Sequence, residues 1–299
     1  MNRVRQLVDA EWTQKMGFTG EQVTVAVLDS GMSWHPDLSG RILCFADFVG
    51  KRMGMYDDYG HGTHVGGILG GSGKQSGGLY RGIAPGCLMI PVKVLDFQGN
   101  GRSEDVIRGI HWVVQNREKY RIRVMNISVG ALTREEKGLS AAVEYAWNSG
   151  LVVVAAAGNR GPGEGSVTSP GCNPKVITVG ASDDSGQEHL GKGVRRGYSG
   201  RGPTRQCIVK PEILAPGSGI CSLNAAFQKT GRPYVYKSGT SMSTPVVSGA
   251  VALLLQKEPE LTNVEIKIRL KEFSDPITEE NATAWGQLNV RKLLSKNFP

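Results

Sequence analysis

Runs of apolar residues alternate along the chain with stretches in which apolar positions recur every three or four residues. Five runs are apolar nearly throughout and rich in β-branched residues, which is typical of strands buried on both faces of a sheet. They lie at 23–29, 88–95, 123–129, 151–157 and 176–181. The stretches 103–117 and 135–150 have helical spacing, and Gly150 offers an end to the second. This alternation predicts a three-layer α/β fold, with a doubly wound, mainly parallel sheet and helices on both faces.

No change in composition marks a domain boundary in the 299 residues, and no internal repeat is present. Hydrophobic residues make up 39% of the chain and charged residues 21%, which is a globular composition. The glycine-rich pieces at 70–78 and 158–165 are short enough to be loops within one domain. We therefore expect residues 1–299 to form a single domain.

The formal net charge of +8 is spread from end to end, with no basic block that carries interleaved aromatic residues. This distribution predicts a solvated basic surface and no nucleic-acid partner. No window of about 18 apolar residues exists, so we expect no membrane span and no membrane partner.

The cysteines number five and stand singly, without the CxxC spacing of a zinc site or the even count of a disulfide framework. Free thiols fit a reducing compartment, and the charged first residues lack the apolar core of a signal peptide. We expect a cytoplasmic protein. The alternative is a secreted protein whose signal and pro-region are missing from this chain.

The first segment with candidate catalytic residues is SGTSMSTP at 238–245, a cluster of hydroxyl side chains in front of a long apolar stretch. A serine hydroxyl becomes a useful nucleophile only when a base removes its proton, and histidine held by a carboxylate is the usual base. Two histidines, His61 and His64, share the segment YGHGTHVGGILGG, in which glycines flank His61. The strand at 23–29 ends in Asp29, where a parallel sheet places its functional residues.

Three other readings of these segments fail on spacing. The pair of histidines lacks the HExxH pattern of a zinc protease. A phosphate-binding loop around Lys74 would need a glycine where Ile68 stands and a hydroxyl residue where Gln75 stands. A lipase-type hydrolase would need GxSxG, whereas the sequence around Ser241 is GTSMS.

The segments VLDSG, GHGTHV and SGTSMSTP, in this order, resemble those of the subtilisin-like serine protease family. The resemblance runs from about Trp12 to Leu294 and includes SGRGPT, KPEILAPG and WGQLNV. YDDYGHGTH, YRGIAPG and SPG look most like the intracellular alkaline subgroup. The resemblance implies a serine endopeptidase that hydrolyses peptide bonds through an acyl-enzyme. About ten residues precede it, too few for a folded inhibitor, so we expect no separate pro-domain.

The resemblance also assigns roles to individual residues. Asp29 would orient the histidine, His61 would be the general base and Ser241 the nucleophile. Asn159 and the backbone N–H of Ser241 would form the oxyanion hole. A pseudoprotease would have lost one of these residues, and none is lost here.

Substrate binding is implied along two extended edges, GNG at 99–101 and SVG at 128–130, between which a peptide adds as a strand. Arg160 at the pocket mouth would disfavour lysine or arginine at P1, unless it points into solvent or pairs with Glu164. Thr168, where many relatives have glycine, would narrow the pocket, so we expect uncharged, medium or large apolar P1 residues. The residues implied in binding are Gly99, Asn100, Gly101, Ser128, Val129, Gly130, Ala157, Gly158, Arg160 and Thr168. None of these motifs bears on oligomeric state.

Calcium is the one metal that the resemblance raises, since subtilisins commonly hold it in the loop after the histidine helix. Asp37 matches one ligand and is a candidate for weak binding. The loop GGSGKQSGG has no Asn, Asp or Glu and adds Lys74, which is unfavourable beside a cation that takes oxygen ligands. We therefore expect no tight structural calcium site, and catalysis needs no cofactor.

Overall fold

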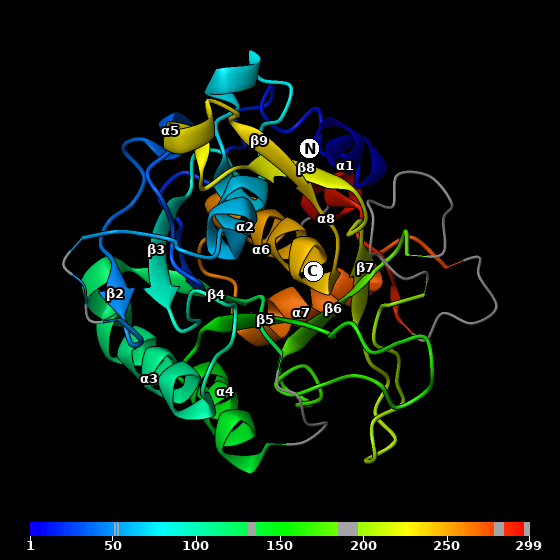
Figure 1. The fold of residues 1–299 in the computed structure, drawn as a ribbon. Coiled ribbons are helices and arrows are strands. Elements are labelled where there is room, and N and C mark those ends of the chain that lie inside the picture. The colour runs from blue at the N-terminus through cyan, green and yellow to red at the C-terminus, as the bar shows by residue number, and fades with distance from the viewer. Residues whose placement is uncertain (51, 53, 131–135, 185–196, 278–283, 296–299) are drawn as a thin grey trace.

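The computed structural model describes residues 1–50, 52, 54–130, 136–184, 197–277 and 284–295. Its centre is a sheet of eight strands in the order β10-β7-β6-β5-β4-β1-β3-β2, and every pair of neighbours is parallel (Figure 1). The strands are β1 Thr24–Asp29, β2 Ala46–Asp47, β3 Leu88–Lys93, β4 Ile122–Ile127, β5 Val152–Ala156, β6 Ile177–Ala181, β7 Ile213–Ala215 and β10 Gly286–Gln287.

Helices cover both faces of this sheet. α2 (His61–Gly70) and α6 (Thr240–Lys257) pack together on one face, and α3 (Ser103–Tyr120) and α4 (Lys137–Asn148) pack together on the other (Figure 1). Strands β1, β5 and β6 are buried along their whole length because side chains on both faces meet helices. The three-layer α/β fold predicted from the apolar runs is confirmed.

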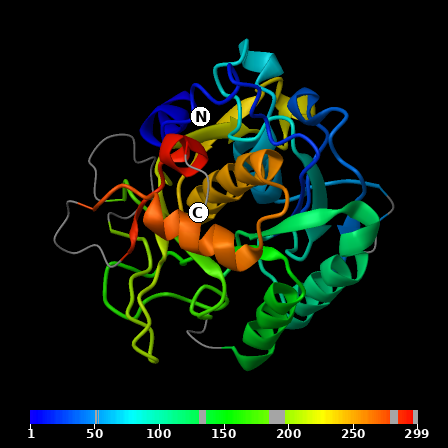
Figure 2. The same cartoon turned by 180° about the vertical axis from the view of Figure 1, so that it is seen from behind.

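Shorter elements complete the described part of the chain. The hairpin of β8 (Ile220–Leu223) and β9 (Tyr234–Lys237) is antiparallel and leads directly into α6. Figure 2 shows α7 on the side opposite to the view of Figure 1. The remaining elements are α1 Asn2–Leu7, η1 Pro36–Leu38, η2 Lys74–Ser76, α5 Phe227–Thr230, α7 Asn263–Glu272 and α8 Val290–Ser295.

The predicted elements differ from the observed ones mainly at their ends. α3 continues to Tyr120, beyond the predicted end of the helix. α4 ends at Asn148, and Gly150 follows with a φ of 88°, a conformation that favours glycine. Residue 135, the predicted start of that helix, lies outside the described residues.

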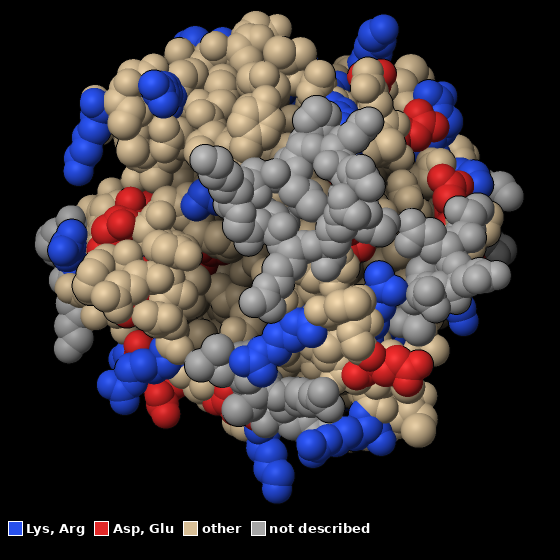
Figure 3. Space-filling model, turned by 45° about the vertical axis from the view of Figure 1, so that its right-hand side comes forward, with Lys and Arg blue, Asp and Glu red and all other residues tan. Residues whose placement is uncertain are grey.

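Two further features concern binding to membranes and to nucleic acids. Among the described residues, no helix combines the length and the apolar character needed to cross a membrane. On the face shown in Figure 3, lysine and arginine side chains are scattered and alternate with acidic ones. The positive charge on this face is therefore not gathered into one patch.

Candidate active site

Asp29 and His61 are joined at the carboxyl end of β1. Nδ1 of His61 lies 2.8 Å from Oδ1 and 2.9 Å from Oδ2 of Asp29. The Asp29 side chain is fully buried, and its Oδ1 also accepts the N–H of Ser30 at 2.7 Å. With Nδ1 held by the carboxylate, Nε2 is the ring atom available to exchange a proton with another group.

Asp57 fixes the start of α2, and therefore the backbone of His61. One carboxylate oxygen accepts the N–H of Gly60 at 2.7 Å and the hydroxyl of Ser30 at 2.8 Å. The other accepts the N–H and the hydroxyl of Thr63, at 2.8 and 2.6 Å. These bonds satisfy donors at the helix start and tie that start to the turn after Asp29.

Glycine is required at position 62 by this close approach. A Cβ on Gly62 would lie 2.1 Å from the carbonyl oxygen of Gly31 and 3.1 Å from the Cβ of Asp29. A larger residue at this position would push α2 away from the end of β1. Gly62 therefore allows α2 to sit against the side chain of Asp29.

Lys93 joins three segments of the site through one buried ammonium group. Its side chain is 1% exposed, and Nζ donates to the carbonyl of Ser30 at 2.8 Å and that of Leu95 at 2.7 Å. It also forms an ion pair with Asp58 at 2.7 Å. Sequence reasoning did not single out Asp57, Asp58 or Lys93. The adjacent acidic pair in YDDYGHGTH was the signal that could have pointed to the first two.

His64 belongs to the packing of α2. It is fully buried, and its Nε2 lies 3.0 Å from the carbonyl oxygen of Ile220 and 3.1 Å from that of Val235. Burial lowers the pKa of His64 to about 3, so the ring is neutral and can donate from Nε2 to these carbonyls. His64 thus ties the β8–β9 hairpin to α2.

Ser241 lies in the first turn of α6 and is half-buried, whereas the residues that follow it are buried. α2 and α6 contact each other where a Cβ on Gly249 would lie 3.4 Å from the carbonyl oxygen of Leu69. Gly249 lies eight residues after Ser241, and Leu69 lies eight residues after His61. The start of α2 contacts Asp29 at the end of β1, and the start of α6 contacts Asn159 after β5, so both helices begin at the carboxyl edge of the sheet.

No hydrogen bond joins Ser241 Oγ to the His61 ring within the described residues, a bond that in many hydrolases tightens only when substrate binds. The two neighbouring serines have other surroundings. Ser238 Oγ accepts the N–H of Gly219 at 2.8 Å. Ser243 Oγ is buried and has no hydrogen-bond partner among the described residues.

Asn159 stands three residues after the end of β5, beside the start of α6. Its Oδ1 accepts both the N–H of Thr240 at 2.9 Å and the hydroxyl of Thr240 at 3.1 Å. The Thr240 hydroxyl in turn accepts the N–H of Gly158 at 3.1 Å. Because Oδ1 is engaged by two donors, Nδ2 is the end of the amide that can donate to a ligand. Thr240 was not identified from the sequence.

Thr168 lies between Gly130 and Gly158, two of the candidate binding residues. It is 2% exposed, and its N–H donates to the carbonyl of Ala157 at 3.1 Å. A Cβ on Gly158 would lie 2.5 Å from Thr168 Oγ1, and a Cβ on Gly130 would lie 2.9 Å from the same atom. The threonine hydroxyl therefore fills space between these two glycines.

The remaining candidate binding residues differ in their burial. Ser128 is buried, and its hydroxyl accepts the side-chain amide of Asn126 at 2.9 Å. Val129 is half-buried and follows it at the end of β4. Across the site, the loop 99–101 begins at Gly99 with a φ of 80°, and the N–H of Asn100 donates to Asp96 at 2.9 Å.

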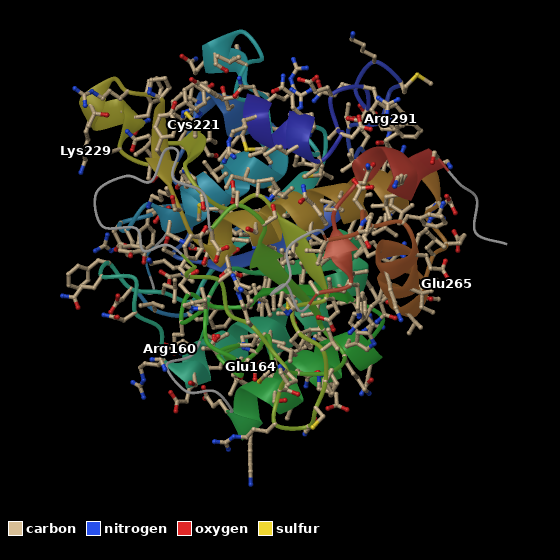
Figure 4. All side chains as sticks on the ribbon, turned by 90° about the vertical axis from the view of Figure 1, so that its right-hand side faces the viewer. Arg160, Glu164, Cys221, Lys229, Glu265 and Arg291 are labelled. Carbon is tan, nitrogen blue, oxygen red and sulfur yellow. The ribbon has the colours of Figure 1, made fainter. Side chains whose placement is uncertain are left out.

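Arg160 is exposed on the loop that follows β5, and Glu164 is exposed on the same loop (Figure 4). No ion pair joins these two side chains, both of which lie in the described residues. The structure therefore does not show the alternative in which Arg160 pairs with Glu164.

The carboxylate of Asp37, the candidate calcium ligand, already accepts hydrogen bonds from the protein. It is fully buried; its Oδ2 accepts the hydroxyl of Tyr234 at 2.7 Å, and its Oδ1 accepts the N–H of Gln75 at 3.0 Å. Its carbonyl accepts the N–H of Ser72 and the guanidinium of Arg41. A cation bound at Asp37 would share these oxygens with their present donors, and the described residues contain no cluster of three His, Cys, Asp or Glu side chains suited to a metal.

Comparison with known proteins places this fold and site in one class. The model of the Subtilase family matches residues 20–286. The serine protease AprX of Bacillus subtilis (strain 168) is 45% identical over 285 residues, which is 90% of this chain and 64% of AprX. The subtilisin of Bacillus pumilus is 35% identical, with 95% of each chain covered. A solved structure of a cold adapted subtilisin-like serine proteinase matches with a TM-score of 0.74 and 32% identity, over 91% of this chain and 90% of the other.

The chain therefore belongs to the subtilase family, whose members are subtilisin-like serine peptidases. It spans 64% of the length of AprX and 65% of that of the thermostable alkaline protease of Halalkalibacterium halodurans, which is 36% identical.

Proposed function

We propose that this chain is a serine endopeptidase that cleaves peptide bonds through an acyl-enzyme on Ser241. His61 accepts the proton of the Ser241 hydroxyl through Nε2 and passes it to the leaving amine. Asp29 keeps the ring in the required tautomer and stabilises the imidazolium that forms. The observation that carries the proposal is the bond from His61 Nδ1 to the buried carboxylate of Asp29, at the edge of the sheet where the helix that bears Ser241 also begins.

The oxyanion hole in this proposal consists of Asn159 Nδ2 and the backbone N–H of Ser241. Thr240 supports the assignment because it holds Asn159 Oδ1 with two hydrogen bonds and leaves Nδ2 to donate. The N–H of Ser241 lies in the first turn of a helix, where N–H groups lack intrahelical acceptors and the helix dipole favours negative charge.

The substrates in this proposal are proteins or peptides that add as a strand between residues 99–101 and 128–130. The P1 side chain enters the pocket between Gly130 and Gly158, where the Thr168 hydroxyl limits the space. An apolar P1 residue of medium size, such as leucine or methionine, fits this pocket best. The exposed guanidinium of Arg160 disfavours lysine and arginine at P1.

Several broader properties belong to the same proposal. We propose a single peptidase domain with no nucleic-acid or membrane partner, active in the cytoplasm, because its cysteines stand singly and its basic residues are dispersed. A chelator should leave activity and thermal stability unchanged, because protein donors occupy both oxygens of Asp37. A fall in melting temperature on chelation would contradict the proposal that the protein holds no structural calcium.

The direct test is hydrolysis of a peptide substrate with an apolar P1 residue. Ser241→Ala and His61→Ala should each lose nearly all turnover and retain about 10³–10⁴ over the uncatalysed rate. Asn159→Ala should lose about 10²–10³ in kcat, a magnitude taken from a subtilisin. Ser238→Ala is the matched control and should remain active. Full activity of Ser241→Ala would reject the proposal.

A further inference from the structure

Lys237 places a positive charge over the ring of Tyr59, the neighbour of His61. It is the last residue of β9, four residues before Ser241, and it is half-buried. Within the described residues, no carboxylate lies within ion-pair distance of its ammonium group. Instead, Nζ lies 5.5 Å from the centroid of the Tyr59 ring. A partly desolvated cation gains free energy from an anionic neighbour, and here the protein supplies none in direct contact.

Tyr59 connects this cation to the site. Its ring stacks on that of His61, with centroids 6.3 Å apart and planes inclined by 29°. A Cβ on Gly99 would lie 2.4 Å from Cζ of Tyr59, so the ring rests directly on the start of the proposed substrate edge. Lys237, Tyr59 and Gly99 thus form a continuous wall beside His61.

The two carboxylates whose charges act on Lys237 are already engaged. Asp57 accepts donors from Ser30, Gly60 and Thr63, and Asp29 binds His61. Burial lowers the pKa of Lys237, and the charges of Asp57 and Asp29 oppose that shift from a distance. Neither carboxylate can turn to Lys237 without giving up the bonds that position His61.

We propose that Lys237 is a specificity-determining residue that binds an acidic side chain of the substrate, aspartate or glutamate, at a position next to the scissile bond. The inference rests on the proposed function and adds to it the class of substrate. A carboxylate on a peptide bound along Gly99 would reach a cation on the wall formed with Tyr59, in a cleft where part of the solvent is excluded. The alternative is that the Lys237 side chain only covers the Tyr59 ring and contributes packing.

The experiment uses peptides that place Glu, Gln or Lys at each position from P3 to P3′ around one apolar P1 residue. The kcat/KM ratio of Glu to Gln is measured at low and at high salt. Wild type should favour Glu at one position by about fivefold to tenfold at low salt, and less at high salt. Lys237→Gln should bring that ratio close to one.

The matched control is Lys229→Gln, which removes the same charge from an exposed lysine on α5 (Figure 4). It should leave the Glu-to-Gln ratio unchanged. A wild-type ratio of one at every position, or a preference that persists in Lys237→Gln, would overturn this inference alone. Cleavage of none of the peptides would overturn the proposed function together with it.

Discussion

Two threonines contact residues of the candidate site: Thr168 lies beside Gly130 and Gly158, and Thr240 binds Asn159. Thr168 directs its hydroxyl between Gly130 and Gly158, where neither wall has a side chain of its own. Thr240 holds the amide of Asn159 by its oxygen. The effect of Thr168 arises from one side chain, so one substitution can remove it. Thr240 holds Asn159 through its backbone N–H as well as its hydroxyl, so a substitution there removes only one of the two bonds.

Thr168→Gly should enlarge the pocket. We expect the ratio of kcat/KM for phenylalanine over leucine at P1 to rise about tenfold, the scale on which pockets discriminate small differences in side-chain volume. The measurement is a tetrapeptide series varied only at P1, with Thr204→Gly as a control on a separate loop. An unchanged ratio would show that Thr168 does not border the P1 side chain.

At the scale of elements, the position of His61 depends on where α2 begins and on how closely α2 approaches β1. α2 begins at His61 because Asp57 accepts the donors of its first turn, and it approaches β1 because residue 62 is glycine. Lys93 at the end of β3 ties the Ser30 turn to the loop that contains Asp58. His61 is therefore positioned jointly by Asp57, by the contact of Gly62 with the end of β1, and by Lys93. A change in any one of these contacts should move the His61 ring.

Lys93→Met should remove the common partner of Asp58 and two carbonyl groups. We expect the free energy of unfolding to fall by about 3 kcal/mol, since the buried carbonyl groups of Ser30 and Leu95 lose their charged donor. Urea denaturation measures this change, and Lys74→Met on the η2 turn should stay within about 0.5 kcal/mol of wild type. Equal stability of Lys93→Met and wild type would show that the ammonium group is dispensable.

Much of the fold could be predicted from the sequence because the central strands are buried on both faces and read as continuous apolar runs. Strands β2, β7 and β10 of the sheet were not predicted, since each has two or three residues and forms only by pairing with a neighbour. The strands of the β8–β9 hairpin were not predicted either. The roles of Lys93 and Lys237 were also missed. A lysine in a sequence carries no sign of whether it is exposed, paired or buried, and only the tertiary fold decides this.

At the scale of the whole molecule, stability should depend on pH through its buried histidines. His64 is neutral in the folded state with a pKa of about 3, below its ordinary value of 6.5, because of burial. Burial also lowers the pKa of His35. As the pH falls below about 6.5, the unfolded chain binds protons that the folded chain does not bind. The free energy of unfolding should therefore decrease steadily between about pH 6.5 and pH 3.

His64→Gln tests this dependence, because it keeps a donor near the carbonyl of Ile220 but cannot titrate. The variant should be less stable than wild type at pH 7 and should lose less stability between pH 6.5 and pH 4. Urea midpoints over this range give the two slopes, and carboxyl groups contribute equally to both proteins. Parallel slopes would show that the unfolding of this protein in acid does not depend on His64.

The central claim is that Ser241 is the nucleophile activated by His61 and Asp29, and covalent labelling tests it most directly. The protein is treated with a fluorophosphonate probe, and the modified residue is located by mass spectrometry. We predict a single modification on Ser241 in wild type, none in Ser241→Ala, and strongly slowed labelling in His61→Ala. A probe that modifies another serine, or that labels Ser241→Ala as fast as wild type, would contradict the account.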